Sequence, residues 1–378
     1  STQAKTLFPY TTLFRSHGQP YQLRHRLPGG HVPVTLNLNP TLKVHHMKPS
    51  TITKVLPSLI KAQRPVFIWG PSGAGKSSVV HQHCGDNKLE IRDVRLSQLD
   101  AIDLRGFPVP DTKAGKTRWL PADFLPTEAD KPGVLFLDEM NGAKPAVGSA
   151  AYQLILDRRL GAYKFPDHWA IIAAGNNASD RGVTHQMPAP LNNRFLHIDY
   201  EIDAEDWHKR AQKDSVYPLI RSYLRLKPGS LHVFDSAKNP RSFPTPRTWY
   251  FVDEIMKTAE YTPTERHELI KGTVGEGAAA EFIGFCRDAA AMPDIDSILM
   301  NPTKAKLPGT QAVMHAVVTT LVDDRVTKSN FDRIMEYVMR LPPELQVVFV
   351  RGAVNKDDSV CNTTAYMDWG LANKDFIV

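Results

Sequence analysis

The stretch "VFIWGPSGAGKSS", residues 66–78, decides the fold, and residues 70–77 match the pattern G-x-x-x-x-G-K-[ST] at every fixed position. The apolar residues before the glycines read as a buried strand, and those after the lysine read as a helix. Glycines in such a turn let several backbone N–H groups point at one anion, beside the positive end of the helix. The stretch therefore predicts a strand, a phosphate-binding loop and a helix.

This loop carries the predicted nucleotide-binding residues. We expect Lys76 to reach the β- and γ-phosphates and the Ser77 hydroxyl to bind Mg²⁺. The candidate nucleotide-binding residues are Gly70, Pro71, Ser72, Gly73, Ala74, Gly75, Lys76, Ser77 and Ser78. A chance glycine turn is the alternative, but the strand before the loop and the helix after it favour nucleotide binding.

Two further apolar runs end in polar residues. "VLFLDEMN", residues 134–141, ends in Asp138, a predicted second Mg²⁺ ligand, and Glu139, which could polarise a water for attack on the γ-phosphate. An acid pair that only ends a strand is the alternative. "IIAAGNNASD" places Asn176 after another buried strand, where its amide could position that water. Asparagine after a strand also commonly forms a turn.

The order of elements predicts an α/β fold: a three-layer αβα core of the P-loop NTPase type with a central parallel sheet, because strands alternate with helices up to about residue 203. Later segments have helical spacing, as in Phe331, Ile334, Met335, Val338 and Leu341, which we interpret as the buried stripe of one helix. The predicted units are a poorly ordered arm (1–48), the α/β domain (49–203), a helical domain (204–300) and a helical extension (301–378). "TLFPYTTLFRS" near the start resembles translated adapter sequence, so no function is assigned to it.

Bulk composition narrows the class of protein. The 378 residues are 42% hydrophobic and 23% charged, and no apolar run approaches the roughly 20 residues that span a bilayer. Cys84, Cys286 and Cys361 are too far apart for a CxxC pair, so we expect no disulfide or zinc site and a reducing cytoplasm. The net charge of +6 permits an acidic partner, but the basic residues are scattered, and a dedicated nucleic-acid surface is not expected.

Taken together, the motifs at residues 70–77 and 134–139, with Asn176, Arg194 and Arg247, follow the order found in AAA+ ATPases. "QLDAIDLRGFP" and "MPAPLNNRFLHIDY" resemble the MoxR-like, dynein-related branch over roughly residues 50 to 260. The resemblance implies ATP with Mg²⁺, and a site at the subunit boundary of a ring, usually a hexamer. This chain has "AGNN" where many members have a sequence like TQNP, which leaves Asn176 and Asn177 as alternatives.

The same resemblance assigns two arginines. Arg194, in "APLNNRFLHIDY", would be the finger that a neighbouring subunit inserts, because a guanidinium can bind two oxygens of the γ-phosphate. Arg247, in "PTPRTW", would contact the γ-phosphate from the helical lid of the same chain. Arg241 is a weaker competitor that we interpret as surface charge.

An insertion separates the first two motifs. "RGFPVPDTKAGKTRWLPADFLP" predicts a hairpin around the turn "KAGK", with Trp119 on its return arm. In related rings such insertions face the pore or the substrate, but packing of Trp119 on the domain core is the favoured interpretation.

The leading functional hypothesis is a ring ATPase that remodels or activates a partner protein. The resemblance suggests a partner with a von Willebrand factor A domain. One alternative is a nucleic-acid motor or restriction-type NTPase, which the positive net charge permits. A nucleotide-gated scaffold without turnover is another, although Glu139, Asn176 and Arg194 argue against it.

Overall fold

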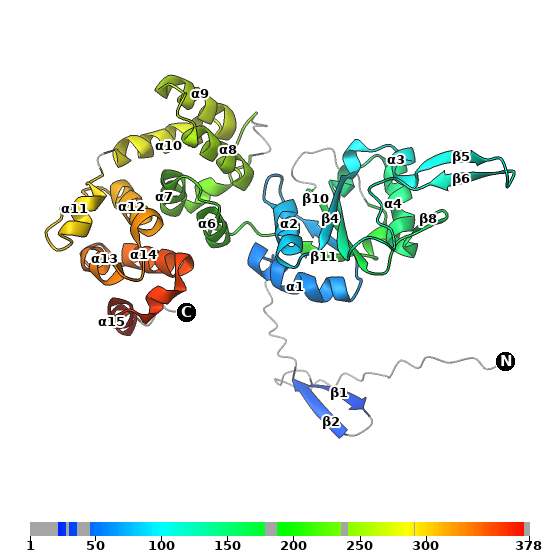
Figure 1. The fold of residues 1–378 in the computed structure, drawn as a ribbon, viewed down its shortest axis with the longest axis horizontal. Coiled ribbons are helices and arrows are strands. Elements are labelled where there is room, and N and C mark those ends of the chain that lie inside the picture. The colour runs from blue at the N-terminus through cyan, green and yellow to red at the C-terminus, as the bar shows by residue number, and fades with distance from the viewer. Residues whose placement is uncertain are drawn as a thin grey trace. The chain divides into compact units, whose positions relative to one another are not determined.

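The computed structural model describes residues 22–27, 30–35, 46–177, 187–235, 241–290 and 292–373. The chain divides into two units, residues 1–46 and residues 47–378, which are treated separately. In the first unit, part of the predicted arm, β1 (Gln22–Leu27) and β2 (Gly30–Thr35) form an antiparallel hairpin (Figure 1).

The second unit begins with a five-stranded sheet whose neighbouring strands are all parallel. Its strands, in spatial order, are β11 (Leu196–Asp199), β3 (Val66–Trp69), β10 (Trp169–Gly175), β7 (Gly133–Asp138) and β4 (Glu90–Arg95). Every residue of β10 is buried, as expected for a central strand of a parallel sheet with both faces covered.

Alternate residues of the central strands face two separate cores. Leu135 and Ile171 join the core beneath α3 (Ala101–Arg105), α4 (Pro145–Asp157) and α5 (Ala189–Asn192). Phe136 and Ile172 join the core beneath α1 (Pro49–Lys61) and α2 (Lys76–Asp86). The period of two in a strand sends neighbouring residues to opposite faces. The predicted three-layer α/β core of the P-loop NTPase type is therefore confirmed.

The order of strands positions the functional motifs. β10 lies between β3 and β7, so the segments that follow these three strands meet at one edge of the sheet. In open parallel sheets, this carboxyl edge is where ligands bind. The phosphate-binding loop, Asp138 and Asn176, which are far apart in sequence, are therefore neighbours in the fold.

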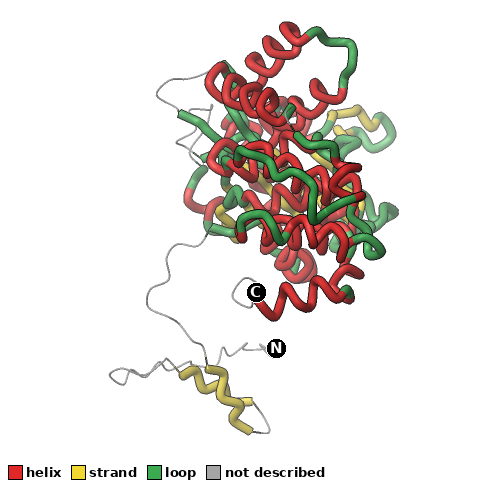
Figure 2. Tube along the Cα trace, turned by 90° about the vertical axis from the view of Figure 1, so that its left-hand side faces the viewer, coloured by secondary structure: helices red, strands yellow, loops and turns green. Residues whose placement is uncertain are grey.

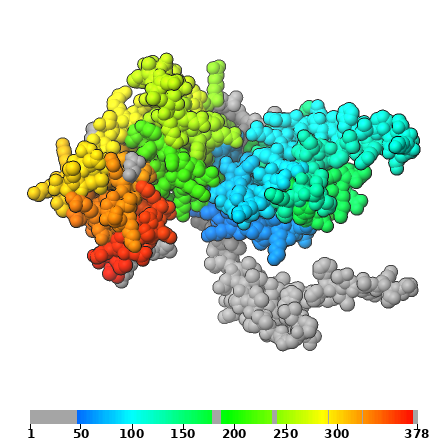
Figure 3. Space-filling model, viewed as in Figure 1, coloured from blue at the N-terminus to red at the C-terminus, as the bar shows by residue number. Residues whose placement is uncertain are grey.

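The predicted insertion is a hairpin of β5 (Phe107–Asp111) and β6 (Lys116–Leu120) that projects from the domain (Figures 1 and 3). The expectation that Trp119 packs on the core is wrong, because its side chain is 47% exposed. A two-stranded ribbon that leaves the body of the domain has no helix over its faces to bury an aromatic ring. A smaller hairpin pairs β8 (Arg159–Leu160) with β9 (Tyr163–Lys164).

After β11 the described elements are all helices (Figure 1). Figure 2 shows how much of the molecule is helical (red). A first hydrophobic cluster joins α6 (Ala204–Lys213), α7 (Pro218–Leu226), α8 (Pro246–Lys257), α9 (Pro263–Val274) and α10 (Glu276–Ala289). Ala316 of α12 (Gln311–Thr320) also belongs to it. A second cluster joins α11 (Ile295–Met300), α12 (Gln311–Thr320), α13 (Phe331–Val338), α14 (Pro343–Lys356) and α15 (Thr364–Ala372). The boundaries proposed at residues 203 and 300 stay predictions.

Three smaller features complete the description of the fold. The apolar stripe predicted for residues 331–341 is buried throughout, so it belongs to the helical core. Cys84, Cys286 and Cys361 are free thiols. Within the described ranges, no helix is long and apolar enough to cross a membrane.

Candidate nucleotide site

The loop between β3 and α2 has the backbone conformation that its glycines allow. Gly73 and Gly75 have φ angles of +72° and +102°, in the region that residues with a side chain rarely adopt. A Cβ atom at Gly73 would lie 2.8 Å from the Thr245 hydroxyl at the start of α8. The loop therefore needs glycine both for its turn and for the close approach of the helical domain.

Lys76, the first residue of α2, connects the loop to the neighbouring strand. Its side chain is buried, and Nζ donates to the carbonyl oxygens of Gly70 at 2.7 Å and Pro71 at 2.9 Å. The same ammonium group donates to Oδ1 of Asn176 at 2.9 Å. Oxygen atoms thus surround the cation, and phosphate oxygens could take their place. The structure brings Lys76 and Asn176 together as the sequence predicts.

The predicted Mg²⁺ ligands are adjacent. The Ser77 hydroxyl donates to Oδ2 of Asp138 at 2.9 Å. A hydroxyl and a carboxylate are hard oxygen donors that suit Mg²⁺, which commonly takes its other ligands from phosphate oxygens and water. The donor set therefore fits the ion. Among the described residues, no group of three or more His, Cys, Asp or Glu side chains could hold another metal ion.

Asn141 fixes the position of Asn176, a role that the sequence analysis missed. Its side-chain Nδ2 donates to the Asn176 carbonyl at 2.7 Å, and the Asn176 N–H donates back to Oδ1 of Asn141 at 3.2 Å. Asn141 is buried, so this pair is partly shielded from water. The only sequence signal was its place three residues after Asp138. With its backbone clamped, Asn176 directs its own amide at Lys76.

Glu139 is held in an unusual conformation. Its φ angle is +53°, which is uncommon for a residue with a side chain and often marks a functional site. Its carboxylate accepts a hydrogen bond from the hydroxyl of Ser97, which follows β4 on the neighbouring edge of the sheet. Ser97 was not predicted, because its contact depends on the pairing of β4 with β7.

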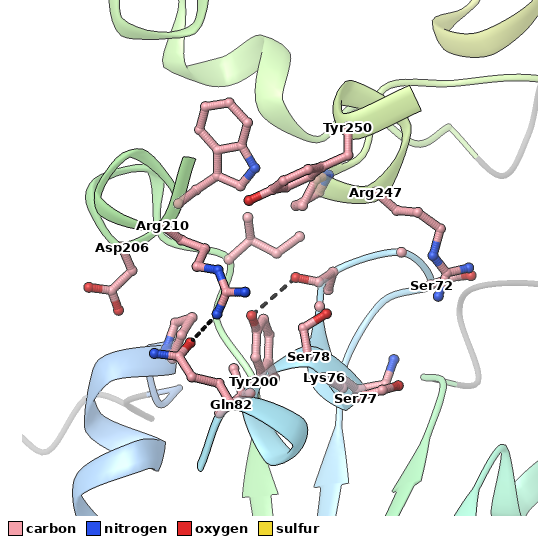
Figure 4. A pocket seen from close by; sticks show the side chains of 18 of the residues that line it. Ser72, Lys76, Ser77, Ser78, Gln82, Tyr200, Asp206, Arg210, Arg247 and Tyr250 are labelled. Atoms are coloured by element: carbon pink, nitrogen blue, oxygen red, sulfur yellow. Dashed lines mark hydrogen bonds between the residues drawn. The ribbon is translucent and has the colours of Figure 1, made fainter. Parts of the chain in front are cut away.

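A cavity of about 400 Å³ lies against the loop, between the α/β domain and the helical domain (Figure 4). Its polar walls include Lys76, Asp138, Glu139 and Asn176, and Arg247 lines it from α8. A second cavity, of about 530 Å³, shares Ser77, Ser78, Gln82, Asp138, Glu139, Arg210 and Arg247 with the first. Arg247 is therefore beside the loop, and its contact with the γ-phosphate stays a prediction.

Two contacts hold the loop from outside: one comes from α8 of the helical domain, and the other from Tyr200, which directly follows β11 in the α/β domain. The Arg247 N–H donates to the Gly73 carbonyl at 3.3 Å, and the Tyr200 hydroxyl donates to the Ala74 carbonyl at 3.1 Å. Burial raises the pKa of Tyr200 well above its ordinary value, so the phenol remains a hydrogen-bond donor. A movement of α8 would therefore act directly on the loop through the hydrogen bond from Arg247 to Gly73.

Arg194 lies outside these cavities. It follows α5 at the start of β11, where its side chain is exposed and its N–H donates to the Leu191 carbonyl. It is not among the residues that line either cavity of its own chain. Arg241 is also exposed, as expected of surface charge. The role of Arg194 in a neighbour's site stays a prediction.

Comparison with known proteins does not identify the family of this chain. No protein-family model and no curated protein matches the chain. The RuvB Holliday junction branch migration motor of Thermotoga maritima is 15% identical over 77% of this chain and 85% of its own, with a TM-score of 0.35. NtrX from Brucella abortus, in complex with ADP, is 14% identical over 87% and 68%, with a TM-score of 0.32. Similarity this distant does not assign a function to this chain.

Proposed function

We propose that this protein is an AAA+ ATPase of the MoxR-like type, which hydrolyses ATP with Mg²⁺ in a ring, usually a hexamer, and remodels or activates a partner protein. The observation that carries the proposal is the convergence of Lys76, Ser77, Asp138, Glu139 and Asn176 at one edge of the sheet, where Lys76 contacts Asn176 and Ser77 contacts Asp138. These residues are the parts that phosphoryl transfer to water requires.

Each residue has a separate task in this mechanism. The loop N–H groups and Lys76 bind the phosphates, and Mg²⁺, held by Ser77 and Asp138, would neutralise charge on them. Glu139 accepts the proton of the attacking water, and Asn176 orients that water. The buried Asn141 keeps Asn176 in register with Lys76.

Two arginines would complete the site. Arg247 reaches it from α8 of the same chain, so closure around the triphosphate would move the helical domain. Arg194 is exposed and lies outside its own chain's cavities, which suits a residue that serves a neighbouring subunit. A finger supplied in trans contributes about 10³–10⁵ in rate in related phosphoryl-transfer enzymes.

The partner is a separate part of the proposal. Resemblance to the MoxR-like branch favours a protein with a von Willebrand factor A domain. Stimulation of ATP hydrolysis by such a protein would support this choice. Stimulation by DNA with a steep dependence on salt would favour a nucleic-acid motor instead.

Release of phosphate from ATP tests the catalytic proposal. The Glu139→Gln variant should bind ATP but hydrolyse it roughly 100-fold more slowly or worse, because the proton acceptor is lost. Lys76→Ala should lose nucleotide binding. Glu336→Gln, which alters an exposed carboxylate on α13, is the matched control and should behave as wild type. Equal hydrolysis by Glu139→Gln and Glu336→Gln would refute the mechanism.

A further inference from the structure

Arg210 on α6 lines both cavities but has no role in the mechanism above. Its side chain is 44% exposed, and its guanidinium lies over the phosphate-binding helix (Figure 4). One terminal nitrogen donates to Oε1 of Gln82 on α2 at 3.0 Å. Arg210 therefore connects the first helix of the helical domain to the helix that begins with Lys76.

A carboxylate holds the other side of this guanidinium. Nε of Arg210 donates to Oδ2 of Asp214, one turn later in the chain, at 2.6 Å. The same Oδ2 accepts a hydrogen bond from the Tyr250 hydroxyl on α8 at 2.9 Å. The side chains of Tyr250, Asp214, Arg210 and Gln82 thus form one hydrogen-bonded series across α8, α6 and α2.

Of the two hydrogen bonds that Arg210 makes, the one to Gln82 is weaker than the one to the Asp214 carboxylate. Gln82 offers a neutral amide oxygen, whereas a phosphate offers negatively charged oxygens that a guanidinium can bind with two parallel hydrogen bonds. Arg210 lies in the cavity that Lys76 and Arg247 also line, so a triphosphate there would meet three cations. The partial exposure of Arg210 leaves its side chain room to turn from Gln82 toward a phosphate oxygen.

We propose that Arg210 is a second arginine of the helical domain that binds the phosphates of the nucleotide, and that Asp214 restrains it until the nucleotide arrives. This inference rests on the proposed nucleotide site. When Arg210 exchanges Gln82 for a phosphate oxygen, α6 follows the nucleotide while Asp214 and Tyr250 carry the movement to α8. The position of the helical domain then depends on the nucleotide through two contacts, Arg210 of α6 and Arg247 of α8.

Titration of ATP into variants that also carry Glu139→Gln, to prevent hydrolysis, tests the inference. Arg210→Ala should weaken ATP binding about ten-fold or more, the usual effect of losing a charge-assisted hydrogen bond. Arg210→Lys should recover part of this loss, because a lysine keeps the charge but not the fork of donors. Lys209→Ala, which removes an exposed charge one residue away that lines neither cavity, is the matched control.

Asp214→Asn separates phosphate binding from a merely structural bridge. If Arg210 binds phosphate, release from Asp214 should leave ATP affinity unchanged or raise it. If Arg210 only joins α6 to α2, Asp214→Asn should weaken ATP binding, just as Arg210→Ala does. That result would show that the inference is wrong. The inference is also wrong if the Arg210→Ala variant binds ATP with the same affinity as the Lys209→Ala variant. Failure of the Glu139→Gln parent to bind ATP would instead overturn the proposed function.

Discussion

The ammonium group of Lys76 contacts oxygen atoms from two parts of the chain, the loop after β3 and Asn176 after β10. Lys76 was predictable from a contiguous motif, and so were Asp138 and Glu139. Asn141, Ser97 and Arg210 were not, because their partners are 35, 42 and 128 positions away. Such contacts depend on strand order and on the position of the helical domain, and no local pattern encodes either.

Among single residues, Asn141 gives a prediction: Asn141→Ala should lower the rate of ATP hydrolysis more than it lowers ATP affinity. It removes both hydrogen bonds to the Asn176 backbone, so the amide that orients water loses its position, whereas the loop itself is unchanged. Each lost hydrogen bond should also lower the free energy of unfolding by about 0.5–1.5 kcal/mol, because both bonds are only partly buried. The measurements are kcat, the ATP dissociation constant and denaturant unfolding. Loss of affinity with an unchanged kcat would contradict this role.

Among the elements, the sheet was predictable because its strands are apolar runs buried on both faces, as in β7 and β10. The surroundings of the hairpin β5–β6 were not predictable from the sequence. Its sequence predicts the two strands and the turn, but whether Trp119 is covered depends on where the ribbon points. Phe107, which is 67% exposed, shares this position outside the core.

A pair of tryptophan substitutions tests that description of the hairpin. Trp119→Ala should change the free energy of unfolding by less than about 0.5 kcal/mol, as is usual for an exposed side chain. Trp249→Ala is the matched comparison: its ring is fully buried, and its loss should cost about 3–5 kcal/mol. Chemical denaturation measures both. A large loss for Trp119→Ala would show that the ring is packed in solution.

Two histidines of the helical elements predict a dependence of stability on pH. Burial, with a smaller contribution from Arg225, lowers the pKa of His315 to about 4 and that of His208 well below 6.5. Both are neutral in the folded chain and protonate more readily when unfolded. Each contribution to stability is therefore complete above about pH 6.5 and is lost as the pH falls toward the pKa of the folded state, which is about 4 for His315.

Thermal unfolding at pH 7.5 and pH 5 checks this expectation. Wild type should lose on the order of 1–2 kcal/mol of stability from His315 between these values. His315→Gln, which does not titrate, should show a smaller loss. If both proteins lose the same stability on acidification, His315 does not protonate on unfolding as described.

From residue 47 onward the chain is an α/β domain followed by helical elements, and these two parts meet at the phosphate-binding loop. Contacts from Arg247 to that loop and from Arg210 to α2 join the nucleotide site to the helical domain. Within one chain the site includes every proposed catalytic residue except Arg194, which is exposed elsewhere. In the proposed ring, Arg194 would reach the nucleotide of a neighbouring copy.

Mixing two inactive variants tests this claim most directly. Glu139→Gln lacks the proton acceptor, and Arg194→Ala lacks the proposed finger while retaining ATP binding, so each protein alone should release almost no phosphate. In a mixed ring, an Arg194→Ala subunit beside a Glu139→Gln subunit has an intact Glu139 and receives an intact Arg194 from its neighbour. The account predicts that the mixture regains ATP hydrolysis. A mixture as inactive as its components, or an Arg194→Ala protein as active as wild type, would contradict it.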